Sequence, residues 1–280
     1  MLNKWTLTGA ALIALVASAA EAGPVAAGFD SIVALGPNDD SATGPIALGF
    51  AANFFGNTYA DTYISNNGYL TFNTGQGTYT PGGLGAGYGG QPIIAAFFAD
   101  VDTRGVGTTT YGYGTYAGHA AFGATWTNVG YFGAHTDKTN TFQILLTDRG
   151  DTGAGNFDIY LNYDQVQWET GDFSGGSGGL GGTSGAVGFN AGNGNAAGTF
   201  YELAGSRVPG TFIDSGTAPL VTTTNDGVAG QLLFQVRNGA VVVPPVGGVP
   251  EPASWALMLG GFGMIGGVMR SRRKTAVSFA

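Results

Sequence analysis

Short runs of alternating apolar and polar residues follow one another along most of the chain, and no long stretch shows helical spacing. Each run is bounded by Gly, Asn or Asp, which is typical of strands separated by turns. The clearest pair, 58–65 and 69–72, flanks Asn66-Asn67-Gly68, and its Asn-Gly step predicts a hairpin. The other predicted strands follow at the spacing expected for a β-sandwich: 93–101, 108–116, 120–129, 139–147, 157–168, 186–189, 199–203 and 231–236.

Glycine accounts for 52 of the 280 residues, well above its usual share of about 7%. Each glycine inside a helix costs roughly 1 kcal/mol relative to alanine, whereas turns accommodate it. We therefore predict an all-β fold, a β-sandwich-like domain of short antiparallel strands with Gly-rich loops. Two Gly-rich runs, 81–90 and 174–185, are expected to be flexible loops because nothing in them could pack.

The predicted strand 120–129 has one clearly apolar face. Alternation along it places Phe122, Ala124 and Trp126 on the same side. We expect that side to face the core, with Trp126 buried. Trp168 also stands within an apolar run and is expected in the core.

The N-terminal segment reads as an export signal. It contains the single base Lys4, a mostly apolar run at 7–16, and then Ala20-Glu21-Ala22. Small residues at Ala20 and Ala22 form the small-x-small pattern that signal peptidase accepts. The apolar run is shorter than the ~20 residues needed to span a bilayer. We therefore predict a signal peptide over 1–22.

The C-terminal segment reads as a membrane anchor. A Pro/Gly/Val linker at 241–249 leads to an uncharged apolar run at 253–269, about the minimum length for a transmembrane helix. A basic cluster follows directly, and by the positive-inside bias it keeps the tail in the cytoplasm: Arg270, Arg272, Arg273 and Lys274. The chain before the run is then outside the membrane.

The element Val249-Pro250-Glu251-Pro252 precedes that apolar run. Together with the basic cluster, the order over 250–275 resembles the PEP-CTERM sorting signal of Gram-negative bacteria. The resemblance implies that an exosortase recognises Pro250, Glu251 and Pro252 and cuts nearby. It also implies a protein held in the inner membrane before sorting and then delivered to the cell surface or extracellular matrix.

The region between the two ends, 23–240, is predicted to be one extracellular domain. Within its core, about 49–203, several stretches occur in the order seen in nidogen-like (NIDO) domains: Phe50 with Phe54-Phe55-Gly56, 63–72, 93–104, 125–129, 141–148, 159–163 and Trp168. The chain thus resembles that family of extracellular domains. The resemblance implies a matrix or adhesion module without catalytic residues.

Charge and cysteine content narrow the set of partners. Between residues 23 and 249 there are five basic and sixteen acidic residues, a net charge of −11. Phosphate binding needs clustered Lys and Arg, so nucleic acid is excluded as a partner. The chain has no cysteine, which rules out disulfides and thiolate metal sites. Cations and neutral polymers such as polysaccharide fit this domain better.

Asp100 and Asp102 are the candidate metal ligands. Strand alternation places both carboxylates on one face, beside the turn at Thr103-Arg104-Gly105. Two such oxygens could begin a Ca²⁺ site, which needs 6 to 8 oxygen ligands. Alternatively, both carboxylates accept hydrogen bonds from the turn and pair with Arg104. Ca²⁺ is the one cofactor that the sequence suggests.

No catalytic arrangement emerges from the sequence. The two histidines, His119 and His135, are far apart, and neither accompanies a nucleophile motif. Arg149-Gly150-Asp151 spells a tripeptide that animal integrins bind, but three-residue matches arise often by chance. Two carboxyl groups far apart in the chain could still form a pair for glycoside hydrolysis, and the sequence leaves that alternative open.

Two functions fit these observations. The first is an exported, non-enzymatic cell-surface or matrix protein that supports cell–matrix adhesion or biofilm and exopolysaccharide structure. The alternative is a carbohydrate-binding or polysaccharide-degrading surface protein. The expected partners are signal peptidase, an exosortase, matrix components and, through the C-terminal helix, the membrane.

Overall fold

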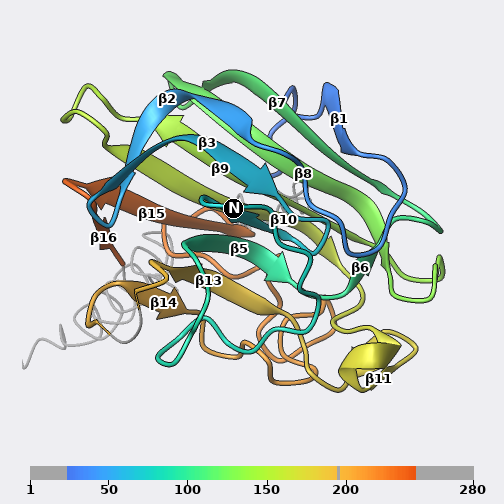
Figure 1. The fold of residues 1–280 in the computed structure, drawn as a ribbon. Helices are drawn as coiled ribbons and strands as arrows, with labels where there is room; N and C mark the ends of the chain where they lie inside the picture. Colours follow the sequence, from blue (N-terminus) through green and yellow to red (C-terminus); the bar gives the residue numbers. More distant parts are fainter. Residues whose placement is uncertain (1–23, 194–195, 244–280) are drawn as a thin grey trace, which may run out of the picture.

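A computed structural model of the chain describes residues 24–193 and 196–243 (Figure 1). Its regular structure is β-strand except for one 3-10 turn, η1 (Asp172–Ser174). The strands are β1 (Ile32–Leu35), β2 (Ile46–Phe54), β3 (Asn57–Ile64), β4 (Tyr69–Thr71), β5 (Ile93–Phe98), β6 (Val101–Asp102), β7 (Thr108–Tyr116), β8 (His119–Tyr131), β9 (Asn140–Asp148), β10 (Phe157–Val166), β11 (Gly176–Ser177), β12 (Leu180–Gly181), β13 (Ala186–Asn190), β14 (Phe200–Glu202), β15 (Gln231–Arg237) and β16 (Ala240–Val242).

The strands form two main antiparallel sheets (Figure 1). The larger sheet has the order β1-β7-β8-β9-β10-β15-β16, with β6 attached to β8. The smaller sheet has the order β14-β13-β5-β4-β3-β2, and β11 and β12 make a separate hairpin. The first and last strands of the described chain therefore occupy opposite edges of the larger sheet. The predicted all-β antiparallel fold is confirmed.

One apolar core lies between the two sheets. Strand β8 contributes Phe122, Ala124 and Trp126 to it, and β4 and β5 contribute Leu70 and Ile94 from the facing sheet. All five side chains are fully buried. The predicted inward face of β8 is thus confirmed, as is the burial of Trp168, which is also inaccessible to solvent.

Several strands differ from the sequence prediction. The run 93–101 splits into β5 and β6, because the chain bends at Ala99 and Asp100. Strand β2 was not predicted; it is rich in Ala and Gly, and its pairing with β3 shifts register between Ala47 and Ala52. Such irregularity obscures the two-residue period on which the prediction depends. The short edge strands β1 and β16 were also not predicted.

The two Gly-rich runs are more structured than predicted. Leu84, in the run 81–90, is fully buried and packs with Ile93 and Phe98. The Glu202 carboxylate accepts hydrogen bonds from the backbone N–H groups of Leu84 and Gly85. The run 174–185 contains the β11–β12 hairpin. The expectation that nothing in these runs could pack is wrong, because one leucine and one carboxylate suffice to anchor the first of them.

The predicted signal peptide and the predicted anchor with its sorting motif lie outside the described residues. Over 24–193 and 196–243, the structure contains no helix of the length and apolar character that a bilayer crossing requires.

The predicted Asn-Gly hairpin is present, with Tyr63 paired to Thr71 and Ile64 to Leu70. Gly68 in its turn has a φ of +83°, and its carbonyl accepts hydrogen bonds from the N–H groups of Ala96 and Phe97 at 3.2 Å each. A Cβ on Gly68 would collide with the Phe97 carbonyl oxygen. Glycine is therefore required both for its backbone conformation and for its approach to β5.

We expect Gly68→Ala to lower the free energy of unfolding by about 3 kcal/mol, since a left-handed alanine costs ~1–2 kcal/mol and the collision adds ~1–3 kcal/mol. Gly118→Ala is the matched control, because Gly118 has a φ of +82° with nothing within 4 Å of the added Cβ. Urea unfolding of a 23–249 fragment measures both. Equal losses in the two variants would contradict the close packing of Gly68 on β5.

Candidate functional site

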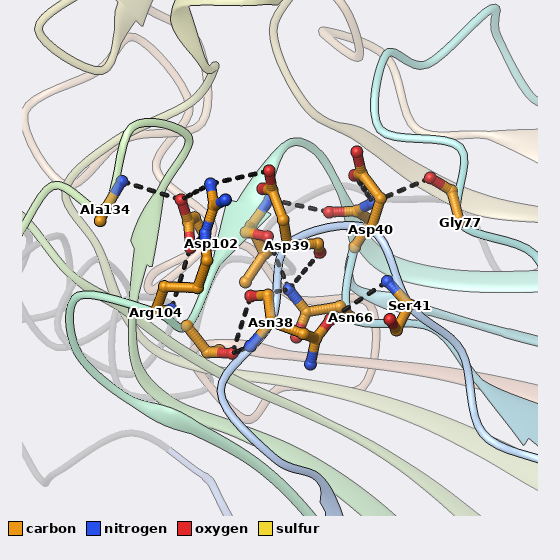
Figure 2. A network of polar contacts seen from close by, with 12 residues as sticks. Asn38, Asp39, Asp40, Ser41, Asn66, Gly77, Asp102, Arg104 and Ala134 are labelled. Atoms are coloured by element: carbon orange, nitrogen blue, oxygen red, sulfur yellow. Dashed lines mark hydrogen bonds and ion pairs between the residues drawn. The ribbon is translucent and has the colours of Figure 1, made fainter.

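Three segments meet at one end of the smaller sheet. The loop between β1 and β2 carries Asp39 and Asp40, the β3–β4 turn carries Asn66, and the bend before β6 carries Asp100. The buried Asn66 amide donates to the carbonyl oxygens of Asp39 and Val101, each at 2.6 Å. Figure 2 shows Asn66 beneath the loop that carries the two aspartates. One side chain thus joins all three segments.

Asn67 adds a second link between the same segments. Its amide nitrogen donates to Asp40 Oδ1 at 2.9 Å, and its amide oxygen accepts the N–H of Val101 at 2.9 Å. Nearby, the carbonyl oxygen of Asn38 accepts the N–H of Thr103 at 2.9 Å. The loop that carries Asp39 and Asp40 is therefore fixed against the bend that carries Asp100.

The negative charge of Asp102 is offset by Arg104. Its Oδ1 accepts the backbone N–H and the Nε–H of Arg104, each at 2.9 Å. Its Oδ2 accepts Arg104 Nη2 at 2.6 Å and the N–H of Ala134 at 2.8 Å. Burial raises the pKa of Asp102, but these hydrogen bonds outweigh it and hold the pKa below its ordinary value.

No ion pair or hydrogen bond of the described residues offsets the charge of the Asp100 carboxylate. Its side chain is 1% exposed, and among the described residues neither carboxylate oxygen has a hydrogen-bond partner. Burial, followed by the negative charges of Asp40, Asp39 and Asp102, raises the pKa of Asp100 to about 7. The fold therefore holds this carboxyl group in a place that disfavours its charge.

Asp39 is only partly compensated. Figure 2 shows the Arg104 guanidinium between Asp102 and Asp39, and its Nη2 lies 2.8 Å from Asp39 Oδ2. Asp39 Oδ1 is buried without a partner in the described structure. Burial, with repulsion from Asp102 and Asp40, raises the pKa of Asp39 to about 6 despite Arg104.

Asp39, Asp40 and Asp100 together form what we call the acidic cluster. One carboxylate oxygen from each lies within 4.8 Å of the others. A cavity of about 220 Å³ adjoins the cluster and is lined by Asp40, Asp100 and three aromatic residues: Tyr79, Phe132 and Phe173. Two of the three carboxyl groups in the acidic cluster, those of Asp40 and Asp100, thus line a cavity.

The structure separates the two aspartates that the sequence analysis paired. Asp102 accepts hydrogen bonds from the turn and pairs with Arg104, as the alternative prediction had it for both aspartates. Asp100 instead faces Asp39 and Asp40. Asp39 and Asp40 were not among the metal ligands predicted from the sequence. The available signal was the run Asn38-Asp39-Asp40-Ser41, whose residue types favour turns. The side chain of Asn38 accepts the N–H of Ser41, three residues on, at 3.1 Å.

The tripeptide Arg149-Gly150-Asp151 has an internal role. The Arg149 guanidinium donates to Asp151 at 3.0 Å and to the buried Asp158 at 2.8 Å. Asp158 also pairs with Arg237 at 2.6 Å. Arg149 thus helps neutralise a buried carboxylate, and its side chain is only 20% exposed.

Comparison with known proteins assigns this chain to a family. The profile described as a nidogen-like domain matches residues 60–238. The chain belongs to the nidogen-like (NIDO) family. The match includes the Asn66–Asn67 turn and the bend at Asp100, while Asp39 and Asp40 precede it. The resemblance inferred from the sequence is therefore confirmed.

Several curated relatives are similar to this nidogen-like chain. Human alpha-tectorin is 30% identical over 233 residues, which is 75% of this chain and 10% of the relative. Mouse alpha-tectorin is 31% identical over the same shares. The nidogen of Drosophila melanogaster is 30% identical over 224 residues, 71% of this chain and 15% of the relative. The chain thus spans a small fraction of these relatives, and no solved structure matches it.

A second profile, the PEP-CTERM protein-sorting motif, matches residues 248–274. This match confirms the resemblance seen in Val249-Pro250-Glu251-Pro252 and the following residues. Together, the nidogen-like domain and the sorting motif support an exported surface or matrix protein that is sorted by an exosortase.

Proposed function

We propose that this nidogen-like protein is a non-enzymatic component of the cell surface or extracellular matrix that supports adhesion or biofilm structure. The observation that carries the proposal is the order of two matches in one chain. The nidogen-like domain ends at residue 238, and the sorting motif begins at residue 248. Sorting would therefore deliver the nidogen-like domain to the outside of the cell.

The proposed route has three steps. Signal peptidase cuts after Ala22 and so removes residues 1–22. The apolar helix 253–269 then holds the protein in the inner membrane, with the basic cluster at Arg270 and beyond on the cytoplasmic side. An exosortase finally acts near Glu251 and releases the β-domain to the surface or matrix.

The surroundings of the two histidines support a role without catalysis. His119 Nδ1 lies 3.7 Å from the exposed Asp151. His135 stacks on Tyr131, with ring centroids 4.5 Å apart, and lies 3.8 Å from Asp137. In the part of the chain that the structure describes, neither histidine is hydrogen-bonded to a hydroxyl group that it could activate as a nucleophile.

The alternative function, binding or degradation of polysaccharide, has one specific observation in its favour. Tyr79, Phe132 and Phe173 line the cavity beside the acidic cluster, and Phe173 is 73% exposed. Aromatic faces of this kind stack on sugar rings, and a hydrolase of glycosidic bonds would use a pair of carboxyl groups. Asp40 and Asp100 line the same cavity as these rings.

A polysaccharide pull-down tests the proposal. The purified 23–249 fragment is mixed with exopolysaccharide from the producing cells, and the reducing ends are then counted. We expect retention on the polymer with no new reducing ends, since a component that supports biofilm structure would hold the polymer without cleaving it. New reducing ends would favour the degrading enzyme. A strain that lacks the protein should form less biofilm, and an unchanged biofilm together with no retention contradicts the proposal.

A further inference from the structure

The acidic cluster contains more negative charge than its surroundings offset. Arg104 is the one cation that the described structure pairs with Asp39 or Asp102. Its contacts satisfy Asp102 and one oxygen of Asp39, but both oxygens of Asp100 and the second oxygen of Asp39 are left without partners among the described residues. An unpaired buried carboxylate destabilises the folded state. A bound cation would offset that cost.

The geometry of the cluster suits a single ion. Two oxygen ligands of one Ca²⁺ ion, each about 2.3–2.6 Å from it, lie no more than about 5 Å apart. One oxygen from each of Asp39, Asp40 and Asp100 meets this limit, since all three lie within 4.8 Å of one another. Three oxygens spaced in this way can approach one ion together.

The supporting contacts hold the ligands in place. Asn66 and Asn67 fix the loop of Asp39 and Asp40 to the backbone of Val101, directly after Asp100. The backbone that carries the three aspartates is therefore held in place by hydrogen bonds that involve no ion. Preorganisation of this kind lowers the conformational cost of binding.

The open side of the cluster has room for the rest of a coordination shell. The adjoining cavity of about 220 Å³ exceeds the ~30 Å³ that one water occupies in the liquid several times over. Ca²⁺ takes 6 to 8 oxygens in flexible geometry, whereas Mg²⁺ demands a near-ideal octahedron. The cluster offers only carboxylate oxygens, which disfavours zinc and copper.

We propose that Asp39, Asp40 and Asp100 bind one Ca²⁺ ion, with water from the adjoining cavity completing its shell. The site ties the β1–β2 loop to the bend between β5 and β6. It goes beyond the proposed function, because it holds whether or not the domain binds matrix polymers.

Thermal unfolding of the full-length protein in detergent tests this site, after removal of metals with EDTA. With a Kd near 10 µM, 1 mM Ca²⁺ should raise the ratio of folded to unfolded protein about 100-fold and shift the Tm upward. Calorimetric titration with Ca²⁺ alone should give one ion per chain. An equal concentration of Mg²⁺ should give a clearly smaller shift.

Asp100→Asn is the decisive variant, since it keeps the shape of the side chain and removes its charge. It should abolish the Ca²⁺ response, yet its Tm in EDTA should equal or exceed that of the unaltered protein, because an unpaired buried charge is gone. Asp40→Asn, at the exposed member of the acidic cluster, should weaken Ca²⁺ binding at least about tenfold. Asp61→Asn, on an exposed part of β3, removes the same charge elsewhere and should keep the full response.

Three results would each overturn the site. Melting curves in Ca²⁺ and in EDTA that coincide would mean that the cluster is held neutral by protons instead. A full Ca²⁺ response in Asp100→Asn would place the ion elsewhere. An equal loss of response in Asp61→Asn would show that Ca²⁺ acts only by screening the acidic surface.

Discussion

Replacing Trp126 with alanine should lower the free energy of unfolding by about 3 to 5 kcal/mol. The indole is fully buried and stacks on Phe142, with ring centroids 5.1 Å apart and an angle of 17° between the planes. Its Nε1–H donates to the carbonyl oxygen of Asn66 at 2.9 Å. Since whole domains are stable by only about 5 to 15 kcal/mol, this one change removes a large part of the total. Urea unfolding of the 23–249 fragment measures the loss.

Two further variants separate the contributions to that loss. Trp126→Phe keeps an aromatic ring but leaves the buried Asn66 carbonyl without its donor, which should cost about 1–3 kcal/mol. Phe173→Ala removes an aromatic ring that is 73% exposed and should change stability by less than about 0.5 kcal/mol. A Trp126→Ala loss as small as that of Phe173→Ala would contradict the packing described for β8.

Replacing Pro250, Glu251 and Pro252 together with alanine should trap full-length protein in the inner membrane. The apolar run 253–269 and the basic cluster after it are unchanged, so insertion should proceed as before. Only recognition by the exosortase is removed. Fractionation with an antibody to the β-domain and an epitope tag after Ala280 follows both ends of the chain.

The unaltered protein should appear at the surface without the tag, lacking roughly its last thirty residues if cleavage falls near the sorting motif. The double variant Pro244→Ala with Pro245→Ala is the matched control, because it removes two prolines from the linker but keeps the motif. It should be sorted normally. If the tag stays with the β-domain in the surface fraction of the unaltered protein, the segment acts as a plain membrane anchor and the proposed sorting route is wrong.

The parts of the fold that the sequence predicted depend on local signals. The Asn67-Gly68 step specifies a hairpin because it accommodates positive φ. The alternation of Phe122, Ala124 and Trp126 specifies an inward face because side chains on a strand point to opposite sides in turn. In both cases the decisive residues are within a few positions of one another.

The acidic cluster could not be predicted in this way. Asp39 and Asp100 are brought together only because the β1–β2 loop packs on the β3–β4 turn, and Asn66 holds that packing through its amide. In the sequence Asn66 reads as an ordinary turn residue. Its burial and its two carbonyl acceptors follow from tertiary structure. No local sequence pattern therefore shows that this turn also binds two segments that are distant in the chain.

The edge position of β16 has a mechanical consequence. Only three residue pairs join β16 to β15, from Arg237 with Ala240 to Gln235 with Val242, and the chain leaves toward the sorting motif at the Val242 end. Tension applied from that side loads the three pairs one after another. It does not load all of them in shear at once. A pull from that side would therefore strip β16 before it loads β15 and the sandwich behind it.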